Sequence, residues 1–129
     1  MGKLIIVAQE NNEAKKAVFA ALEPLYAEGF VILSCMTGDE VFKKLELGTP
    51  SLLILDLVLP ETDGFEVINR LRTNLATSKI PIVVVCSPQQ GITKLITKSF
   101  GVEAYLNRPF APKRLLEVVK ENLRGGNND

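Results

Sequence analysis

Histidine is absent from this chain, and cysteine is scarce. The 129 residues contain no His and two Cys, Cys35 and Cys86. Without histidine the chain cannot form a Ser-His or Cys-His catalytic dyad, a His-ligated zinc site or a histidine proton switch near neutral pH. The two cysteines lie far apart in apolar stretches and form no C-x-x-C motif. We therefore interpret them as reduced core residues of an intracellular protein.

An excess of charge of either sign is also missing. Fifteen Lys and Arg balance fifteen Asp and Glu, and the sequence pI is near 6.3. Binding to nucleic acid or to an anionic membrane depends on clustered Lys and Arg, so we expect this domain to contact neither. No apolar run approaches the roughly 18 residues that span a bilayer, and no secretory leader pattern is present. A cytoplasmic location is expected.

The chain has the size and composition of one globular domain. Apolar residues make up 47% of it, and 129 residues bury enough surface for a single core without metal or disulfide bonds. We predict one domain over residues 1–124. Residues 125–129, Gly-Gly-Asn-Asn-Asp, are predicted to be a flexible tail or the stub of a linker.

Short apolar runs alternate along the chain with segments of helical periodicity. The runs are predicted to be buried strands at residues 4–8, 30–35, 52–55, 82–86 and 104–106. The helical segments carry apolar residues at helical spacing over residues 14–25, 41–45, 65–71, 92–100 and 115–123. Strict alternation with right-handed crossovers builds a doubly wound α/β fold, in which helices cover both faces of a parallel sheet.

Capping residues and one proline mark where these helices should begin and end. Asn11 or Asn12, Thr37 and Asp63 are candidate N-caps. Pro24 lies inside the first helical pattern, where it has no N–H to donate to the preceding turn. We expect it to kink that helix or to end it early.

Asp56 points most clearly to a site. It interrupts LLILDLVLP, the most apolar stretch of the chain, where a buried carboxylate is unfavourable unless it is paired or hydrogen-bonded. Ligands of an open parallel sheet gather outside the carboxyl ends of its strands, which is where Asp56 is predicted to lie. Position alone leaves two interpretations open: a functional carboxylate, or a strand-end carboxylate that accepts loop amides.

Three motifs near these strand ends resemble one known family. LLILDLVLPETDGFEVINRLR, IPIVVVCS and EAYLNRPF are similar to the third, fourth and fifth strand ends of response-regulator receiver domains, and the resemblance covers essentially the whole chain. It implies a flavodoxin-like (βα)5 fold with strand order 2-1-3-4-5. It also places Asp56 where the family's aspartate takes a phosphoryl group from a sensor kinase. Arg108-Pro109 matches a Lys-Pro step whose peptide bond is commonly cis.

Four positions depart from the pattern of this family. Ala8 and Gln9 stand where the family has two acidic residues that hold Mg²⁺, so we expect no cofactor and weak or absent Mg²⁺ binding. Glu10 is either a substitute metal ligand or a solvated charge near a helix start. Cys86 replaces the Ser or Thr that bonds the phosphoryl group, and Arg108 replaces the lysine that neutralises it.

These departures lead to a specific hypothesis about Asp56 and Arg108. A direct ion pair between them would occupy the carboxylate and hold the pocket in one conformation without phosphate. Tyr105 lies at the family's switch-aromatic position, either as a partner-facing residue or as a ring packed at the sheet edge. Cys86 is interpreted as a buried small hydrophobe in preference to a redox-sensing thiol.

The combined pattern predicts a degenerate receiver in two-component signalling: a protein-interaction module, not an enzyme, that does not run the Mg²⁺-dependent phosphorylation cycle. Its expected partner is a sensor kinase, an output domain or another regulator, or a second copy bound through the fourth helix, fifth strand and fifth helix. The candidate residues of this face are Lys94, Lys98, Tyr105, Asn107 and Lys113. One alternative is a working phosphoacceptor at Asp56 with Glu10 as metal ligand. A nucleotide or FMN binder ranks last, because residues 8–12 contain no glycine to cradle phosphate.

Overall fold

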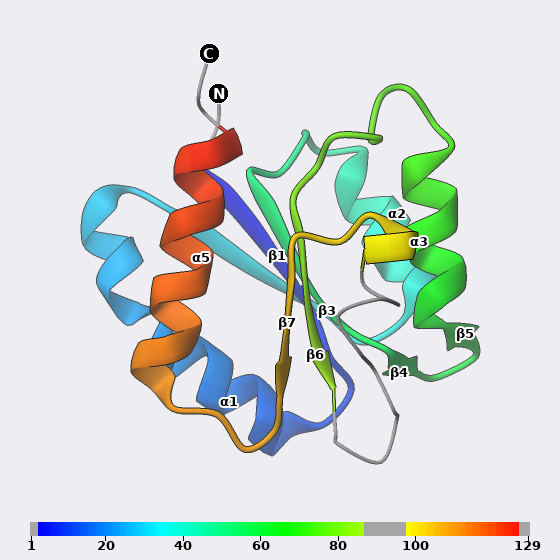
Figure 1. The fold of residues 1–129 in the computed structure, drawn as a ribbon. Helices are drawn as coiled ribbons and strands as arrows, with labels where there is room; N and C mark the ends of the chain where they lie inside the picture. The colour runs from blue at the N-terminus through cyan, green and yellow to red at the C-terminus, as the bar shows by residue number, and fades with distance from the viewer. Residues whose placement is uncertain (1–2, 87–97, 127–129) are drawn as a thin grey trace.

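A central parallel sheet organises the computed structural model, which describes residues 3–86 and 98–126. Its strands are β1 (Leu4–Ala8), β2 (Val31–Cys35), β3 (Leu52–Asp56), β6 (Ile82–Cys86) and β7 (Ala104–Asn107). Their spatial order is β2-β1-β3-β6-β7, and every neighbouring pair is parallel (Figure 1). This arrangement confirms the predicted 2-1-3-4-5 order of five strands.

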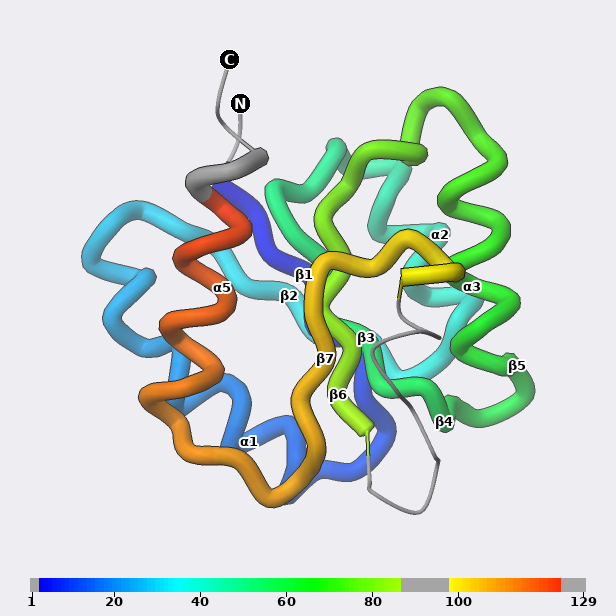
Figure 2. The backbone as a smooth tube through the Cα atoms, viewed as in Figure 1, coloured from blue at the N-terminus to red at the C-terminus, as the bar shows by residue number. Residues whose placement is uncertain are grey.

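Helices cover both faces of the sheet. They are α1 (Asn12–Ala21), the 3₁₀ helix η1 (Glu23–Glu28), α2 (Gly38–Leu45), α3 (Gly64–Arg72) and α5 (Pro112–Gly126). Figures 1 and 2 show α1 and α5 on one face and α2 and α3 on the other. Most of the helix predicted over residues 92–100 lies outside the described residues. The part that is described, residues 98–100, is helical. None of the described helices is long and apolar enough to cross a membrane.

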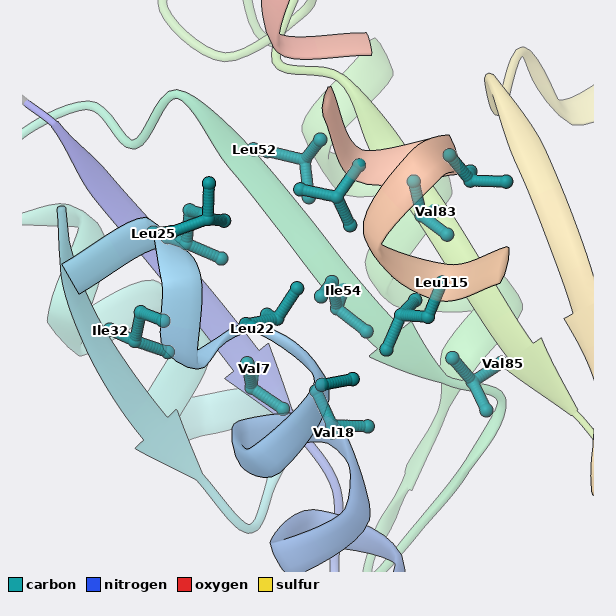
Figure 3. Close-up of a cluster of buried hydrophobic side chains, with 14 of the residues drawn as sticks. Val7, Val18, Leu22, Leu25, Ile32, Leu52, Ile54, Val83, Val85 and Leu115 are labelled. Carbon is teal, nitrogen blue, oxygen red and sulfur yellow. The ribbon is translucent and has the colours of Figure 1, made fainter. Parts of the chain in front are cut away.

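The sheet separates two apolar clusters. Ile5 and Val7 belong to the cluster between the sheet and helices α1 and α5, where Figure 3 shows Val7 and Leu115 among the buried side chains. Ile6 and Ala8 belong to the cluster under α2 and α3. Side chains therefore alternate along β1 between two buried faces, which is why the strand reads as an unbroken apolar run in the sequence.

The observed helix starts agree with the predicted caps. The side chains of Asn11, Thr37 and Asp63 each accept a hydrogen bond from a backbone amide two or three residues further on. Helix α1 ends at Ala21, and the chain continues as the 3₁₀ helix that contains Pro24. The early end expected from this proline is confirmed.

Two features differ from the prediction. The segments β4 (Val58–Leu59) and β5 (Thr62–Asp63) form a small antiparallel sheet directly after β3, and strands of two residues are too short to show alternation in a sequence. Helix α5 continues through Gly126, so residues 125 and 126 of the predicted tail are helical, and residues 127–129 lie outside the described residues. Glycine lowers helix propensity by about 1 kcal/mol without forbidding the helix.

Candidate functional site

The carboxyl ends of the strands meet at one edge of the sheet, at the lower end of the strands in Figure 1. On neighbouring strands, Ala8 is level with Leu55, and Cys86 is level with Asn107. Asp56 is the last residue of β3, at the same edge. The sheet therefore brings together the strand-end residues that the sequence singled out, although they lie up to a hundred positions apart in the chain.

Asp56 is buried at this edge, and both of its carboxylate oxygens are hydrogen-bonded. Its side chain is 6% exposed. Oδ1 accepts a hydrogen bond of 3.0 Å from the backbone amide of Val58, and Oδ2 accepts one of 3.1 Å from Nη1 of Arg108. The predicted ion pair between Asp56 and Arg108 is confirmed. The carboxylate also accepts a loop amide, as the second interpretation of its position predicts.

Arg108 reaches Asp56 from the end of β7. Its backbone amide donates to the carbonyl of Cys86 at 2.8 Å, which extends the β6–β7 ladder by one residue. The peptide bond between Arg108 and Pro109 is cis, as the resemblance implied. The Arg108 side chain is 31% exposed. The guanidinium thus neutralises a buried carboxylate while part of it remains in contact with water.

The connection between Asp56 and α3 is tightly packed. The amide of Gly64 donates to the carbonyl of Leu57 at 3.0 Å. A Cβ atom at Gly64 would lie 2.6 Å from the Cα of Leu57, so the backbone would have to move to accommodate any other residue. This close approach fixes the loop whose Val58 amide bonds Asp56.

Cys86 is a buried thiol beside the ion pair. Its Sγ donates to Oδ1 of Asn107 at 3.3 Å and lies 3.8 Å from the carbonyl oxygen of Leu106. Burial raises the pKa of the Cys86 thiol, an effect that the charge of Arg108 opposes and that of Asp56 reinforces. The thiol is thus kept protonated, which supports its interpretation as a core residue because the thiolate is the reactive form.

Cys35, at the end of β2, has a similar environment. It is a buried free cysteine, and burial raises its pKa to about 11. The two thiols lie on strands separated by β1 and β3. Adjacent strands are about 4.8 Å apart, so a disulfide between Cys35 and Cys86 is out of reach.

The end of β1 has lost its expected carboxylates and contains a buried amide. Ala8 and Gln9 are both fully buried. Within the part of the chain that the structure describes, neither Nε2 nor Oε1 of Gln9 has a hydrogen-bond partner. Glu10, the next residue, is exposed.

These residues do not fit the Mg²⁺ ion that the family resemblance implies. Mg²⁺ prefers octahedral oxygen coordination in which carboxylates take part. Asp56 is one carboxylate, and both of its oxygens already accept hydrogen bonds from the protein. Among residues 3–86 and 98–126, no group of three or more His, Cys, Asp or Glu side chains is placed to hold a metal ion.

The candidate interaction face is described in part. Lys98, Asn107 and Lys113 are exposed, whereas Tyr105 is half-buried and packs against the cluster under α2 and α3. Lys94 lies outside the described residues. Tyr105 therefore has the sheet-edge packing of one predicted alternative while part of it remains accessible.

Arg72 is an organising residue that the sequence analysis missed. Its guanidinium donates to the carbonyl oxygens of Ser78, Ile80 and Gly101 at 2.8 to 3.1 Å, and it pairs with Glu103 at 3.3 Å. Its acceptors are mainly backbone carbonyls, which no residue pattern reveals. The available signal was an Arg in the last turn of a helix, which is also typical of an ordinary solvated charge.

Comparisons with known proteins point to one family. The profile of the response regulator receiver domain family matches residues 5–120. The alkaline phosphatase synthesis transcriptional regulatory protein PhoP of Bacillus subtilis is 29% identical over 124 residues, which cover 96% of this chain and 50% of PhoP. The phosphate regulon transcriptional regulatory protein PhoB of Rhizobium meliloti is 34% identical over 100 residues, 78% of this chain and 44% of PhoB. The chain thus spans about half the length of these relatives.

Solved structures show the same fold. The signal receiver domain of a signal transduction histidine kinase from Syntrophus aciditrophicus superposes with a TM-score of 0.83 at 21% identity, covering 99% of this chain and 95% of that one. The receiver domain of NtrX from Brucella abortus gives a TM-score of 0.81 at 20% identity, covering 93% and 98%. At these identities the likeness establishes the architecture alone.

Proposed function

Because this chain belongs to the response regulator receiver domain family of two-component signalling, we propose that it acts there as a protein-interaction module that works without phosphorylation. The observation that carries the proposal is the state of the Asp56 carboxylate. One oxygen accepts the Val58 amide and the other accepts Arg108. The family's phosphoacceptor position is thereby engaged by groups of the protein itself.

The charges of the pocket support this proposal. Asp56 contributes one negative charge and Arg108 one positive charge, while Ala8, Gln9 and the protonated Cys86 contribute none. Phosphoryl transfer depends on positioning and on neutralising the charge that develops on the phosphoryl oxygens, for which Mg²⁺ is the usual agent. A pocket that is already neutral offers little attraction for a divalent cation.

Such a module needs an input other than phosphate. A ligand shifts a conformational equilibrium only through its different affinities for the two states. Without a phosphoryl group, that difference must come from a bound partner, and we propose a sensor kinase, an output domain or another regulator in this role. The exposed Lys98, Asn107 and Lys113 are the candidate contacts, and a second copy bound through the same face is part of this proposal.

A direct phosphorylation assay tests the proposal. The protein is incubated with acetyl phosphate and Mg²⁺, and its intact mass is followed by mass spectrometry. We expect no mass gain at Asp56. A gain of one phosphoryl group in the natural sequence that disappears in Asp56→Asn would overturn the proposal in favour of a working phosphoacceptor with Glu10 as metal ligand.

A restored pocket serves as the matched control. The double variant Ala8→Asp with Gln9→Asp returns two carboxylates to the end of β1 and leaves Asp56 unchanged. Phosphorylation of this variant, but not of the natural sequence, would locate the defect at these two positions. If neither protein is phosphorylated, the triple variant that also carries Arg108→Lys tests whether the guanidinium is the remaining obstacle.

A further inference from the structure

Gln9 carries an amide that nothing described in the structure satisfies. The residue is 0% exposed, and within residues 3–86 and 98–126 both its Nε2 and its Oε1 lack a hydrogen-bond partner. A buried polar group without a partner is destabilising, whereas an apolar side chain of the same size at this position would not be. The protein therefore keeps an amide at a buried position where, among the described residues, it makes no hydrogen bond.

The strand register places this amide beside Asp56. The pairing of β1 with β3 ends at Ala8 and Leu55, and the backbone amide of Gln9 still donates to the carbonyl of Cys35 on β2 at 3.0 Å, so continuing the register by one residue places Gln9 opposite Asp56. Side chains alternate along both strands, and Val7 and Ile54, two positions earlier, belong to the same cluster. Gln9 and Asp56 therefore extend from neighbouring strands, about 4.8 Å apart, toward the same side of the sheet.

Arg108, the present partner of Asp56, is accessible to a second acid. Its side chain is 31% exposed, whereas that of Asp56 is 6% exposed. The segment from residue 104 to residue 116 contains three cations, Arg108, Lys113 and Arg114, and no Asp or Glu. Lys113 and Arg114 are exposed. Arg114 pairs with Glu117 at 3.7 Å, so Lys113 is the exposed cation of this segment that an acidic group of a partner would meet before the outer part of the Arg108 guanidinium.

We propose that Gln9 is the alternate hydrogen-bond donor to Asp56, and that it takes over the carboxylate when an acidic group of a partner protein draws Arg108 away. In this exchange Nε2 of Gln9 donates to the Asp56 carboxylate, while Arg108 pairs with a carboxylate of the partner. The inference rests on the proposed function, because it supplies the phosphate-free input that such a module needs. No covalent bond forms or breaks.

The physical reason for the exchange is the burial of Asp56. Removing the partner of a buried charge is strongly unfavourable, because the charge loses its compensation without regaining water. A neighbouring amide donor lowers that penalty by bonding the charged acceptor. Among the described residues the side-chain amide of Gln9 has no hydrogen-bond partner while Arg108 is in place, and it gains one when Arg108 leaves. The same side chain thus makes release of Arg108 easier than burial alone would allow.

A double-mutant cycle of unfolding free energies tests this role. The variants are Gln9→Leu, Arg108→Met and the two combined, each measured by urea unfolding. We expect Gln9→Leu alone to leave stability unchanged or raised, because it removes an unpaired amide. We expect Arg108→Met to lower the folding equilibrium constant at least about tenfold more in the Gln9→Leu background than in the natural one.

Several outcomes of the cycle would overturn the inference. Additive effects of Gln9→Leu and Arg108→Met would show that Gln9 does not compensate for the loss of Arg108. Gln9→Leu combined with Arg72→Met, at the opposite end of the sheet, is the matched control and should be additive. If the Arg108→Met variant keeps its stability only when millimolar Mg²⁺ is present, a metal ion and not the Gln9 amide compensates the carboxylate, which also contradicts the inference.

The exchange has a spectroscopic readout in the intact domain. Hexaglutamate is titrated into the ¹⁵N-labelled protein as an acidic probe, with hexaglutamine as the neutral control. We expect the side-chain resonances of Arg108 Nε–H and Gln9 Nε2–H₂ to shift together, with hexaglutamate only. Movement of Arg108 without Gln9, or no movement of either, would contradict the inference.

The exchange and the proposed function can be contradicted independently of each other. The proposed function fails if Asp56 of the natural sequence takes a phosphoryl group. The exchange fails if the cycle is additive or the two resonances do not move together, even when Asp56 remains unphosphorylated.

Discussion

Arg72 and Arg108 lie at opposite ends of the sheet and bind different kinds of acceptor. At the end where β6 and β7 begin, Arg72 makes five hydrogen bonds, four of them to backbone carbonyls and one to Glu103. At the end where these strands finish, Arg108 bonds the single carboxylate of Asp56. One arginine is bound mainly by backbone atoms, and the other by a side chain.

The difference shows which end can change. Arg72 joins the end of α3 to the segments before β6 and before β7, so none of these can move without breaking several of its bonds. Within residues 3–86 and 98–126, the Arg108 side chain makes one hydrogen bond, to the carboxylate of Asp56. The amino end of the sheet is therefore held by several hydrogen bonds of Arg72, whereas the ion pair of Arg108 at the carboxyl end can be exchanged for another contact.

The largest loss of unfolding free energy should follow removal of Arg72 at the amino end of the sheet. Arg72→Met leaves the part-buried carbonyls of Ser78 and Ile80 without their donor, so we expect a loss of about 3 kcal/mol or more in unfolding free energy. Urea unfolding followed by circular dichroism measures it. Arg70→Met is the control, because Arg70 is exposed and lies 3.9 Å over the Phe42 ring. Its loss should stay near 1 kcal/mol. Equal losses in the two variants would show that the carbonyl contacts of Arg72 add little.

A smaller loss of unfolding free energy is expected from replacing Arg108 by Met at the carboxyl end of the sheet. Arg108→Met should lower the unfolding free energy by about 1 to 2 kcal/mol, below the roughly 3 to 5 kcal/mol that follows when a buried ion pair loses one partner and nothing replaces it. The same urea experiment measures it beside Arg72→Met. A loss as large as that of Arg72→Met would remove the distinction between the two ends.

Alkaline pH should lower the unfolding free energy of the domain through the buried thiol of Cys35. Burial raises the pKa of Cys35 from 9.0 to about 11. Between these values the unfolded chain releases a proton that the folded chain keeps, so stability falls as pH rises through this range. At about pH 10 the loss should be about 1 kcal/mol relative to about pH 8. Cys35→Val should lack this part of the decline, and identical pH profiles for the two proteins would rule out the assignment to Cys35.

The sequence could predict what depends on strand order and charge. Five apolar runs with helical segments between them indicate a parallel sheet, and such a sheet brings its strand ends to one edge. A buried Asp56 then needs a cation, and Arg108 is the cation that follows a strand at the same edge of the sheet, although β6 lies between that strand and β3. The ion pair was predictable because burial and opposite charge leave few alternatives.

The features that the sequence did not predict depend on contacts that leave no recognisable residue pattern. Arg72 bonds backbone carbonyls, and every residue supplies a carbonyl whatever its side chain. The strands β4 and β5 have two residues each, which is too short for an alternating pattern to appear in the sequence. For Gln9, the sequence shows that a carboxylate is absent, but only packing shows that the amide replacing it is buried and has no hydrogen-bond partner among the described residues.

The smallest expected effect is that of Mg²⁺ on the natural sequence. A ligand that binds the folded state stabilises it by RT ln(1 + [L]/Kd), so an ion without a site changes nothing. We expect millimolar Mg²⁺ to alter the unfolding free energy by less than about 0.2 kcal/mol, relative to Mg²⁺-free buffer of equal ionic strength. The double variant Ala8→Asp with Gln9→Asp should instead gain about 1 kcal/mol or more, as for a site near saturation. Thermal unfolding with and without Mg²⁺ compares the two proteins, and an equal gain in both would mean that Asp56 already binds the ion despite Arg108.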